Sequence, residues 1–212
     1  TIMQLEFANQ VCKHTKGKAL IIAPLAVVGQ TKKEGAKFGI KVNICRTQDD
    51  VKKGINITNY EMLEHFTAKD FDAVILDESS ILKSFTSSTR NLLIDMFQMT
   101  PYRLACTATP SPNDHSELGN HAEFLGIMSR TEMLATYFIH DGSNTSSWRL
   151  KGYGEKKFWE WVATWAVCVR NPSDLVYSTE GYILPELNII EHITASEPLE
   201  YELVARRAET LD

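Results

Sequence analysis

The most constraining feature of this 212-residue sequence is a run of four apolar residues, 73–76, that leads directly into two carboxylates, Asp77 and Glu78. A short uninterrupted apolar run predicts a strand that is buried on both faces of a parallel sheet. Ligands of open α/β sheets bind beyond the carboxyl ends of such strands, where this pair would lie. One carboxylate there can hold magnesium, and the next can orient or deprotonate an attacking water. The alternative is a surface pair that caps the following helix.

Strand and helix patterns alternate along the first half of the chain. Apolar runs or alternating patterns predict strands over residues 19–23, 41–45, 55–60 and 73–76, with a further strand and its exit loop over 103–110. Helical spacing of apolar residues predicts helices over 2–12, 30–38, 60–66 and 87–99. This alternation predicts an α/β fold, a parallel sheet with helices on both faces.

The pattern changes after about residue 117, where helical signals dominate. Residues 118–138 are predicted to be mostly helical, 141–147 a polar loop, 158–167 a Trp-rich helix, 187–194 a strand and 197–211 a charged helix. We expect residues 117–170 to form a helical subregion packed on the sheet. The tryptophans are interpreted as core residues, with a base-stacking platform as the alternative.

Composition excludes some classes of protein and leaves others open. The net charge of −5 shows no basic footprint for nucleic acid, although a local basic face would suffice. No apolar run approaches the roughly 20 residues that a membrane helix needs, so no membrane partner is expected. The four cysteines lie far apart without metal-ligand spacing, and buried thiols in a reducing cytosol are expected. His115 and His121 lack the spacing of a helical metal pair.

No GxxxxGKS or GxxxxGKT phosphate loop occurs in the sequence. Other segments nevertheless follow one another in an informative order. These segments are "ALIIAP" (19–24), "TNYEML" (58–63), "VILDESSILKS" (74–84), "RLACTATPSPND" (103–114), "ELGNHAEFL" (117–125) and "VCVRNPSDL…LPELN" (167–188). Taken together they resemble motifs of the first RecA-like lobe of superfamily-two helicases, and most closely the Swi/Snf-type DNA translocases. Each motif alone is weak, but the ordered set covers nearly the whole chain.

The resemblance implies an ATP-hydrolysing motor that moves on DNA, with duplex DNA favoured over single-stranded DNA. ATP and magnesium are the implied cofactors, with Asp77 as a magnesium ligand and Glu78 as the residue that polarises water. Thr1 matches the last residue of the family's GKT loop, so it is expected to bind the cofactor through magnesium. Residues 1–196 would form the lobe and 197–212 the start of a connection to a second RecA-like lobe. The isolated chain is then expected to be inactive.

Motif II departs from the family pattern. It is Asp-Glu-Ser-Ser here, so Ser80 stands where the family has His, and it can hydrogen-bond but cannot carry a charge. Thr107 and Thr109 follow the neighbouring strand and are candidates for coupling motif II to the nucleic-acid face. The alternative for these threonines is strand propensity and turn bonding.

Candidate nucleic-acid contacts are hydroxyls, amides and cations near the ends of the strands. They are Gln30, Thr31, Lys32, Lys33, Thr58, Asn59, Lys83 and Arg90. A solvated helix face is the alternative for the two adjacent lysines.

Two other functions remain open. One is another superfamily-two motor, such as an RNA helicase or a restriction translocase subunit. The other is a non-catalytic RecA-like module that only binds nucleic acid or protein, because a fold alone does not establish activity. We expect a cytoplasmic protein of bacterial or phage origin, including nucleoid-associated proteins.

Overall fold

The computed structural model describes residues 1–83, 87–141 and 144–191. The strands are β1 (Lys18–Ala23), β2 (Val42–Ile44), β3 (Gly54–Asn59), β4 (Ala73–Asp77), β5 (Tyr102–Cys106), β6 (Phe138–Asp141) and β7 (Asn144–Leu150). The α-helices are α1 (Ile2–Thr15), α2 (Leu25–Lys37), α3 (Ser88–Phe97), α4 (Leu118–Leu125), α5 (Arg130–Tyr137) and α6 (Glu155–Val162). Short 3-10 helices are η1 (Gln48–Asp50), η2 (Tyr60–His65), η3 (Ala68–Asp70), η4 (Ser79–Lys83), η5 (His115–Glu117), η6 (Gly152–Gly154) and η7 (Pro172–Leu175).

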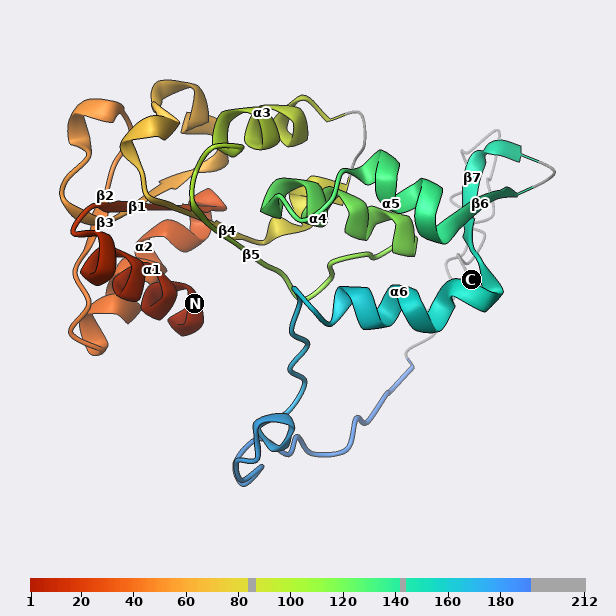
Figure 1. Ribbon diagram of the computed structural model, residues 1–212. Helices are drawn as coiled ribbons and strands as arrows, with labels where there is room; N and C mark the ends of the chain where they lie inside the picture. Colours follow the sequence, from red (N-terminus) through yellow and green to blue (C-terminus); the bar gives the residue numbers. More distant parts are fainter. Residues whose placement is uncertain (84–86, 142–143, 192–212) are drawn as a thin grey trace, which may run out of the picture. The chain divides into compact units, whose positions relative to one another are not determined.

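The first five strands form one parallel sheet in the order β2-β3-β1-β4-β5 (Figure 1). The central strand β1 is almost wholly buried because it pairs with β3 on one side and β4 on the other. After β1 the chain builds the β2–β3 side, and it then crosses to β4 on the other side. The carboxyl ends of β1, β3 and β4 therefore meet at a topological switch point of the kind where α/β sheets bind ligands. The predicted α/β fold with a parallel sheet is confirmed.

Each face of the sheet is covered by helices, as the sequence predicts. On one face, α1 and α2 pack Leu5, Ala8 and Val28 against alternate residues of β1, such as Ile21. The helix α3 lies on the other side of the sheet from α1 and α2 (Figure 1). The residues of β1 that point that way pack with α3, α4 and η2, and Phe97 lies in that core. The strand side chains alternate between the two layers, so the continuous apolar runs are explained by burial on both faces.

A smaller core lies in the region that follows the sheet. Phe158 of α6 is fully buried against Met133 and Phe138, and its ring contacts those of Tyr137 and Trp161. The helix α5 begins with a capping box in which Ser129 Oγ accepts a hydrogen bond of 3.2 Å from the Glu132 amide. The Trp-rich segment thus supplies core residues, although Trp159 is 40% exposed.

This region is less helical than the sequence predicts. The strands β6 and β7 form an antiparallel hairpin that begins at Phe138 and ends at Leu150, so the expected polar loop over 141–147 is wrong in part. The reason is packing: Trp148 and Leu150 lie two residues apart and place the same face of β7 on the core of α5 and α6. Elsewhere in the chain, the helix predicted over 60–66 is present as the 3-10 helix η2.

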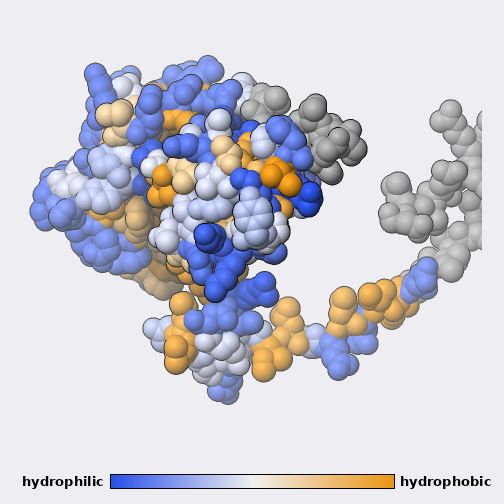
Figure 2. All heavy atoms as spheres, turned by 45° about the vertical axis from the view of Figure 1, so that its right-hand side comes forward, coloured by the Kyte–Doolittle hydropathy of each residue, from blue (hydrophilic) through white to orange (hydrophobic). Residues whose placement is uncertain are grey.

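Contacts divide the chain into two units, 1–166 and 167–212. In the second unit, the described residues 167–191 contain one regular element, η7, and expose many large apolar side chains (orange in Figure 2). The strand predicted from residue 187 is therefore absent over 187–191, and its remainder and the helix predicted over 197–211 lie outside the described residues. Among the described helices, none combines the length and apolar character needed to cross a membrane.

The packing of α3 makes a stability prediction. Phe97 is fully buried, whereas Met99, two residues later, is 87% exposed. Replacing Phe97 with Ala should lower the free energy of unfolding by about 3–5 kcal/mol, because it leaves a cavity in the core between the sheet and α3. Met99→Ala is the matched control and should change it by less than about 0.5 kcal/mol. Urea unfolding measures both, and equal effects of the two exchanges would contradict the packing described.

Candidate functional site

Polar residues gather at the carboxyl edge of the sheet. Asp77 is the last residue of β4 and is half-buried beside Cys106, its partner in β5. The preceding residue pair of β4 and β1, Leu76 and Ile22, is fully buried. The first polar group therefore appears where the strand leaves the core, which is where the sequence places it.

Two side chains from other elements hold Asp77 in place. Gln4 in the first turn of α1 donates a hydrogen bond of 2.6 Å from Nε2 to Asp77 Oδ1. The Tyr60 hydroxyl donates a bond of 2.6 Å to the Asp77 carbonyl oxygen. Burial, followed by the negative charges of Asp77 and Glu78, raises the pKa of Tyr60, so the phenol remains a proton donor. A hydrogen bond to a charged group stabilises by about 1.5–3 kcal/mol, so Gln4 fixes one carboxylate oxygen.

The neighbouring residue, Glu78, has an unusual backbone. Its φ of 51° lies in the left-handed region, which non-glycine residues rarely adopt. The turn directs the chain from β4 into η4 and leaves the Glu78 side chain exposed. Such a conformation costs about 1–3 kcal/mol and persists only where surrounding contacts impose it.

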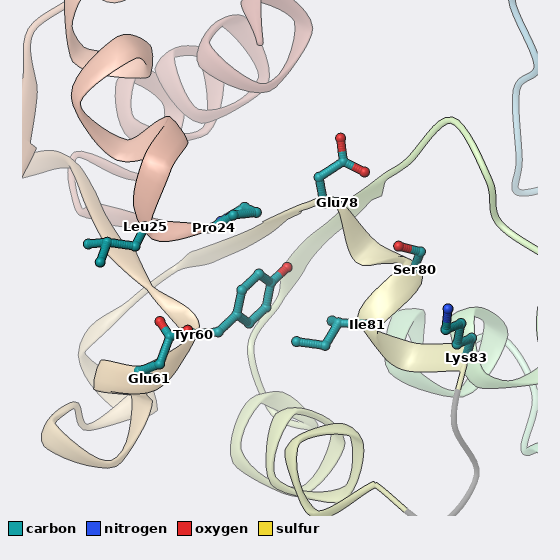
Figure 3. Close-up of a pocket in the computed structure, with 8 residues that line it drawn as sticks. All are labelled: Pro24, Leu25, Tyr60, Glu61, Glu78, Ser80, Ile81 and Lys83. Atoms are coloured by element: carbon teal, nitrogen blue, oxygen red, sulfur yellow. The ribbon is translucent and has the colours of Figure 1, made fainter. Parts of the chain in front are cut away.

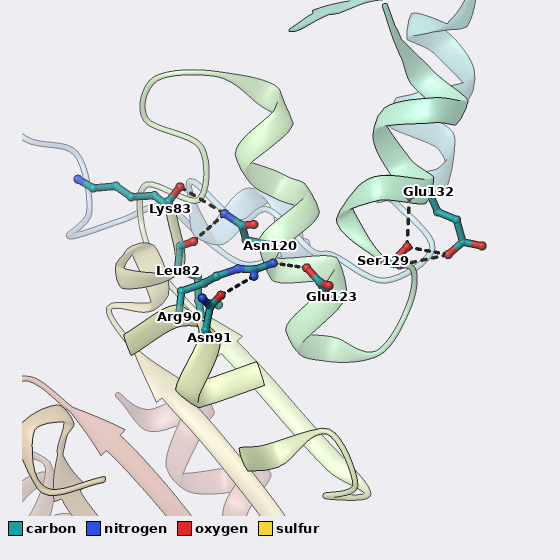
Figure 4. Close-up of polar contacts among 8 residues, drawn as sticks. All are labelled: Leu82, Lys83, Arg90, Asn91, Asn120, Glu123, Ser129 and Glu132. Atoms are coloured by element: carbon teal, nitrogen blue, oxygen red, sulfur yellow. Dashed lines mark hydrogen bonds and ion pairs between the residues drawn. The ribbon is translucent and has the colours of Figure 1, made fainter. Parts of the chain in front are cut away.

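The contacts that impose this turn come from α4. The buried Ser79 Oγ lies 3.2 Å from His121 Nε2, and the two form a hydrogen bond. Asn120 Nδ2 donates to the carbonyl oxygens of Leu82 at 2.7 Å and Lys83 at 3.3 Å (Figure 4). The helix α4 therefore anchors the segment that follows Glu78 at three points.

A depression of about 350 Å³ opens beside Glu78. Figure 3 shows its eight lining residues, which come from the residues that directly follow β1 and β4 and from α2, η2 and η4. Among them are Pro24, Tyr60, Glu78, Ser80 and Lys83. The structure thus brings Glu78, Ser80 and Lys83, three of the predicted site residues, to one depression at the switch point.

The two candidate threonines lie just beyond the end of β5. Thr107 is half-buried, and its Oγ1 accepts a hydrogen bond of 3.0 Å from the amide of Thr109, which is exposed. Since Cys106 pairs with Asp77, Thr107 lies one residue past that pair. The local bond is the turn bonding named as the alternative, and a coupling role for these threonines stays a prediction.

The expected nucleic-acid residues divide into exposed and buried groups. Gln30, Lys32, Lys33 and Lys83 are exposed. Thr31 is fully buried and donates to the Val27 carbonyl oxygen at 3.1 Å, so its side chain is inaccessible to nucleic acid and this prediction is corrected. The helix α2 turns Thr31 inward on the same face as Val28.

The remaining three are engaged or enclosed. Thr58 is 1% exposed, so its side chain is inaccessible to nucleic acid and this prediction is corrected as well. Asn59 is 7% exposed and donates to the Glu61 carboxylate. Arg90 forms an ion pair with Glu123 of α4 and donates to Asn91 Oδ1 at 2.8 Å (Figure 4). These contacts give Arg90 a structural partner, and none of the three residues lines the depression beside Glu78.

The donor atoms around Asp77 suit magnesium. Gln4 occupies one carboxylate oxygen, and the other accepts no hydrogen bond within the described part of the chain. Gln4 Oε1 is itself buried without a hydrogen-bond partner among the described residues. Thr1 is exposed at the N-cap of α1, three residues from Gln4, so its hydroxyl lies on the same helix end. Carboxylate and hydroxyl oxygens are the ligands that Mg²⁺ prefers.

Sequence reasoning missed Gln4 and His121 as partners of this edge. The available signal for Gln4 was a polar residue in the predicted apolar row of the first helix, four residues before Ala8. For His121, the signal was its place in one helical row between Leu118 and Leu125.

Comparison with known proteins supports the fold. The chain is similar to a SWI2/SNF2 ATPase core from Sulfolobus solfataricus, solved in complex with double-stranded DNA. The TM-score is 0.51 and the identity 22%, and the match covers 62% of this chain and 30% of that one. The chain thus spans under a third of the length of that protein. No protein-family model matches the chain, and no curated protein matches it either. The sheet is therefore RecA-like in architecture, as the resemblance implied.

The burial of His121 predicts a pH dependence of stability. Burial lowers its pKa below the ordinary value of 6.5, so the unfolded chain binds more protons as the pH falls through 6.5. The stability that the neutral imidazole contributes is present above that pH and is lost below it, by at most about 1.4 kcal/mol per pH unit.

Urea unfolding of the wild type and His121→Gln at pH 7.5 and pH 5 measures this effect. The wild type should lose more stability on acidification than the variant, which lacks the titrating group. A parallel loss in both proteins would show that His121 does not titrate differently on unfolding.

Proposed function

We propose that this chain forms the first RecA-like lobe of an ATP-dependent motor that moves on DNA. The observation that carries the proposal is the pair Asp77 and Glu78 at the switch point of the sheet, with Asp77 fixed by Gln4 and Tyr60 and Glu78 turned outward beside a depression. The half-buried, oriented carboxylate of Asp77 is suited to hold a metal ion, and the exposed carboxylate of Glu78 is suited to activate water.

Each residue then has a defined task in ATP hydrolysis. Asp77 would hold magnesium through the oxygen that Gln4 leaves free, directly or through water, and the Thr1 hydroxyl would be a second ligand. When bound, magnesium neutralises negative charge on the transferred phosphoryl group. Glu78 would accept a hydrogen bond from the attacking water, orient it and polarise it toward loss of its proton. The bond between Gln4 and Asp77 keeps the metal-binding oxygen in one position, which is the preorganisation such catalysis requires.

DNA is the proposed track, and duplex DNA is favoured. The structural neighbour was solved with double-stranded DNA, which supports this choice for a chain of the same fold. Lys83 is exposed in the depression beside Glu78, so a phosphate contact there would adjoin the hydrolytic carboxylate. Ser80, Thr107 and Thr109 would then link the two activities.

A second RecA-like lobe would complete the motor. The match covers under a third of the neighbouring ATPase core, so a motor of that size requires further chain. An ATP site at a strand edge also needs phosphate-cradling backbone groups and cations beyond Asp77 and Glu78. We therefore place the catalytic activity in the natural full-length protein.

The central test is ATP hydrolysis by the natural full-length protein with and without duplex DNA. DNA should stimulate the rate. Glu78→Gln should lower kcat at least about 100-fold, because the amide cannot accept the proton of water, while nucleotide binding survives. Glu64→Gln is the control, since Glu64 is an exposed carboxylate of η2 outside the depression.

Two outcomes would contradict the proposal. One is a full rate for the Glu78 variant. The other is binding of DNA without hydrolysis of ATP under any condition, which would favour the non-catalytic module. Stimulation by RNA alone would instead favour a different superfamily-two motor.

A further inference from the structure

A second depression, of about 580 Å³, lies on the β2 side of the sheet. It is lined by the later part of α2, by the residues that lead into β2 and by the loop before β3. Val42 and Ile55, which pair at the start of their strands, both line it. Because the five strands of the main sheet are parallel, this depression lies toward their amino ends, whereas Asp77 ends β4 at the opposite edge.

Positive charge is concentrated around this depression. Lys32, Lys41, Lys52 and Lys53 line it, all four are exposed, and no lining residue is acidic. No salt bridge joins these lysines to a carboxylate in the described ranges 1–83, 87–141 and 144–191. Four exposed lysines around one depression stand out in a chain whose net charge is −5.

The loop that carries two of these lysines is fixed by a buried asparagine. Asn56 is fully buried, accepts from the Lys52 amide at 2.9 Å and donates to the Lys52 and Gly54 carbonyl oxygens at 2.7 Å and 3.1 Å. Asn43 donates to Asn56 Oδ1 at 3.0 Å. The backbone beneath Lys52 and Lys53 is therefore held in one conformation, so ordering it on binding costs little.

Asp50, the carboxylate that precedes Lys52 by two residues, is engaged in local hydrogen bonds. Asp50 accepts from the amides of Arg46 at 2.9 Å and Thr47 at 3.2 Å, and these bonds lower its pKa. Its negative charge is thus held at the start of η1 and does not line the depression.

The other lining groups indicate which anion fits. The floor is apolar, with Ile40, Val42 and Ile55, and the lysine stems can cover it. The lining contains no aromatic ring for stacking a base and no arginine for reading its edge. Its one amide side chain, Asn43, already donates to the Asp50 carbonyl oxygen at 2.8 Å. Flexible ammonium groups without directional partners match a row of phosphates better than they match a nucleotide base.

We propose that this lysine-lined depression is a second nucleic-acid contact, which binds the phosphate backbone of duplex DNA without reading sequence. The proposal goes beyond the proposed function because it concerns the opposite edge of the sheet and requires no ATP hydrolysis. It gives the motor a second point of attachment to DNA. It also assigns Lys32 to this site, away from the depression beside Glu78.

The test is the salt dependence of DNA binding by the natural full-length protein without nucleotide. The four lysines are replaced together by Gln. The control variant carries Gln at Lys13, Lys16, Lys69 and Lys157, which changes the net charge equally at lysines outside both depressions.

Fluorescence anisotropy with a 30-base-pair duplex gives Kd at several KCl concentrations. Each lost phosphate contact lowers the magnitude of the slope of log K against log salt by about 0.9. The variant without the four lysines should therefore lose about 1.8–3.6 from the slope and bind at least about tenfold more weakly. The control should retain the wild-type slope.

An unchanged slope in the pocket variant, or an equal loss in the control, overturns the proposal. The proposal is also overturned if poly-glutamate binds as tightly as DNA and this binding requires the four lysines, because a site for the phosphate backbone should prefer DNA. The binding assay needs no ATP hydrolysis. A protein that hydrolyses no ATP, but whose DNA binding still depends on the four lysines as expected, would therefore refute only the proposed motor function.

Discussion

The central position of β1 between β3 and β4 is the constraint on which the rest of the structure depends. Five consecutive buried residues of β1 leave that strand no place except the middle of a sheet covered on both faces. Because β3 and β4 both run parallel to β1, the carboxyl ends of these three strands lie at the same edge of the sheet. Asp77, Glu78 and Tyr60 are brought together from distant parts of the sequence for that reason, and Gln4 reaches them because α1 packs beneath the same strands.

The turn at Glu78 connects this edge to the rest of the molecule. A left-handed glutamate is unfavourable by itself, so its persistence depends on contacts made by the following residues. His121 and Asn120 supply them from α4, and Arg90 adds an ion pair to Glu123 of the same helix. A movement of α4 would therefore shift the residues that hold the backbone turn at Glu78. The opposite edge of the sheet has a different character, because lysines on a rigid loop replace carboxylates there.

The sequence alone predicts the elements that are defined by the burial of apolar residues. It does not predict the parts of the structure that depend on contacts between distant segments. The strands β1 and β4 follow from uninterrupted apolar runs, and the place of Asp77 and Glu78 follows from the end of one run. The hairpin β6–β7 was missed because its polar residues look like a loop until Trp148 and Leu150 are seen to pack on α6. The prediction for Thr31 is wrong because adjacent polar residues of a helix do not share one surface, and helical periodicity turns Thr31 inward with Val28. The strand order, and with it the partners of Asp77, depends on tertiary packing that a single sequence does not specify.

The most direct measurement is a crystal structure of the natural full-length protein with magnesium and a non-hydrolysable ATP analogue. The account predicts the metal at Asp77, bound directly at about 2.0–2.1 Å or through one water, and the terminal phosphate facing Glu78. It also predicts that the hydrogen bond between Gln4 and Asp77 persists in that complex. A nucleotide bound away from the carboxyl edge of the sheet, or a metal held without Asp77, would contradict the central claim.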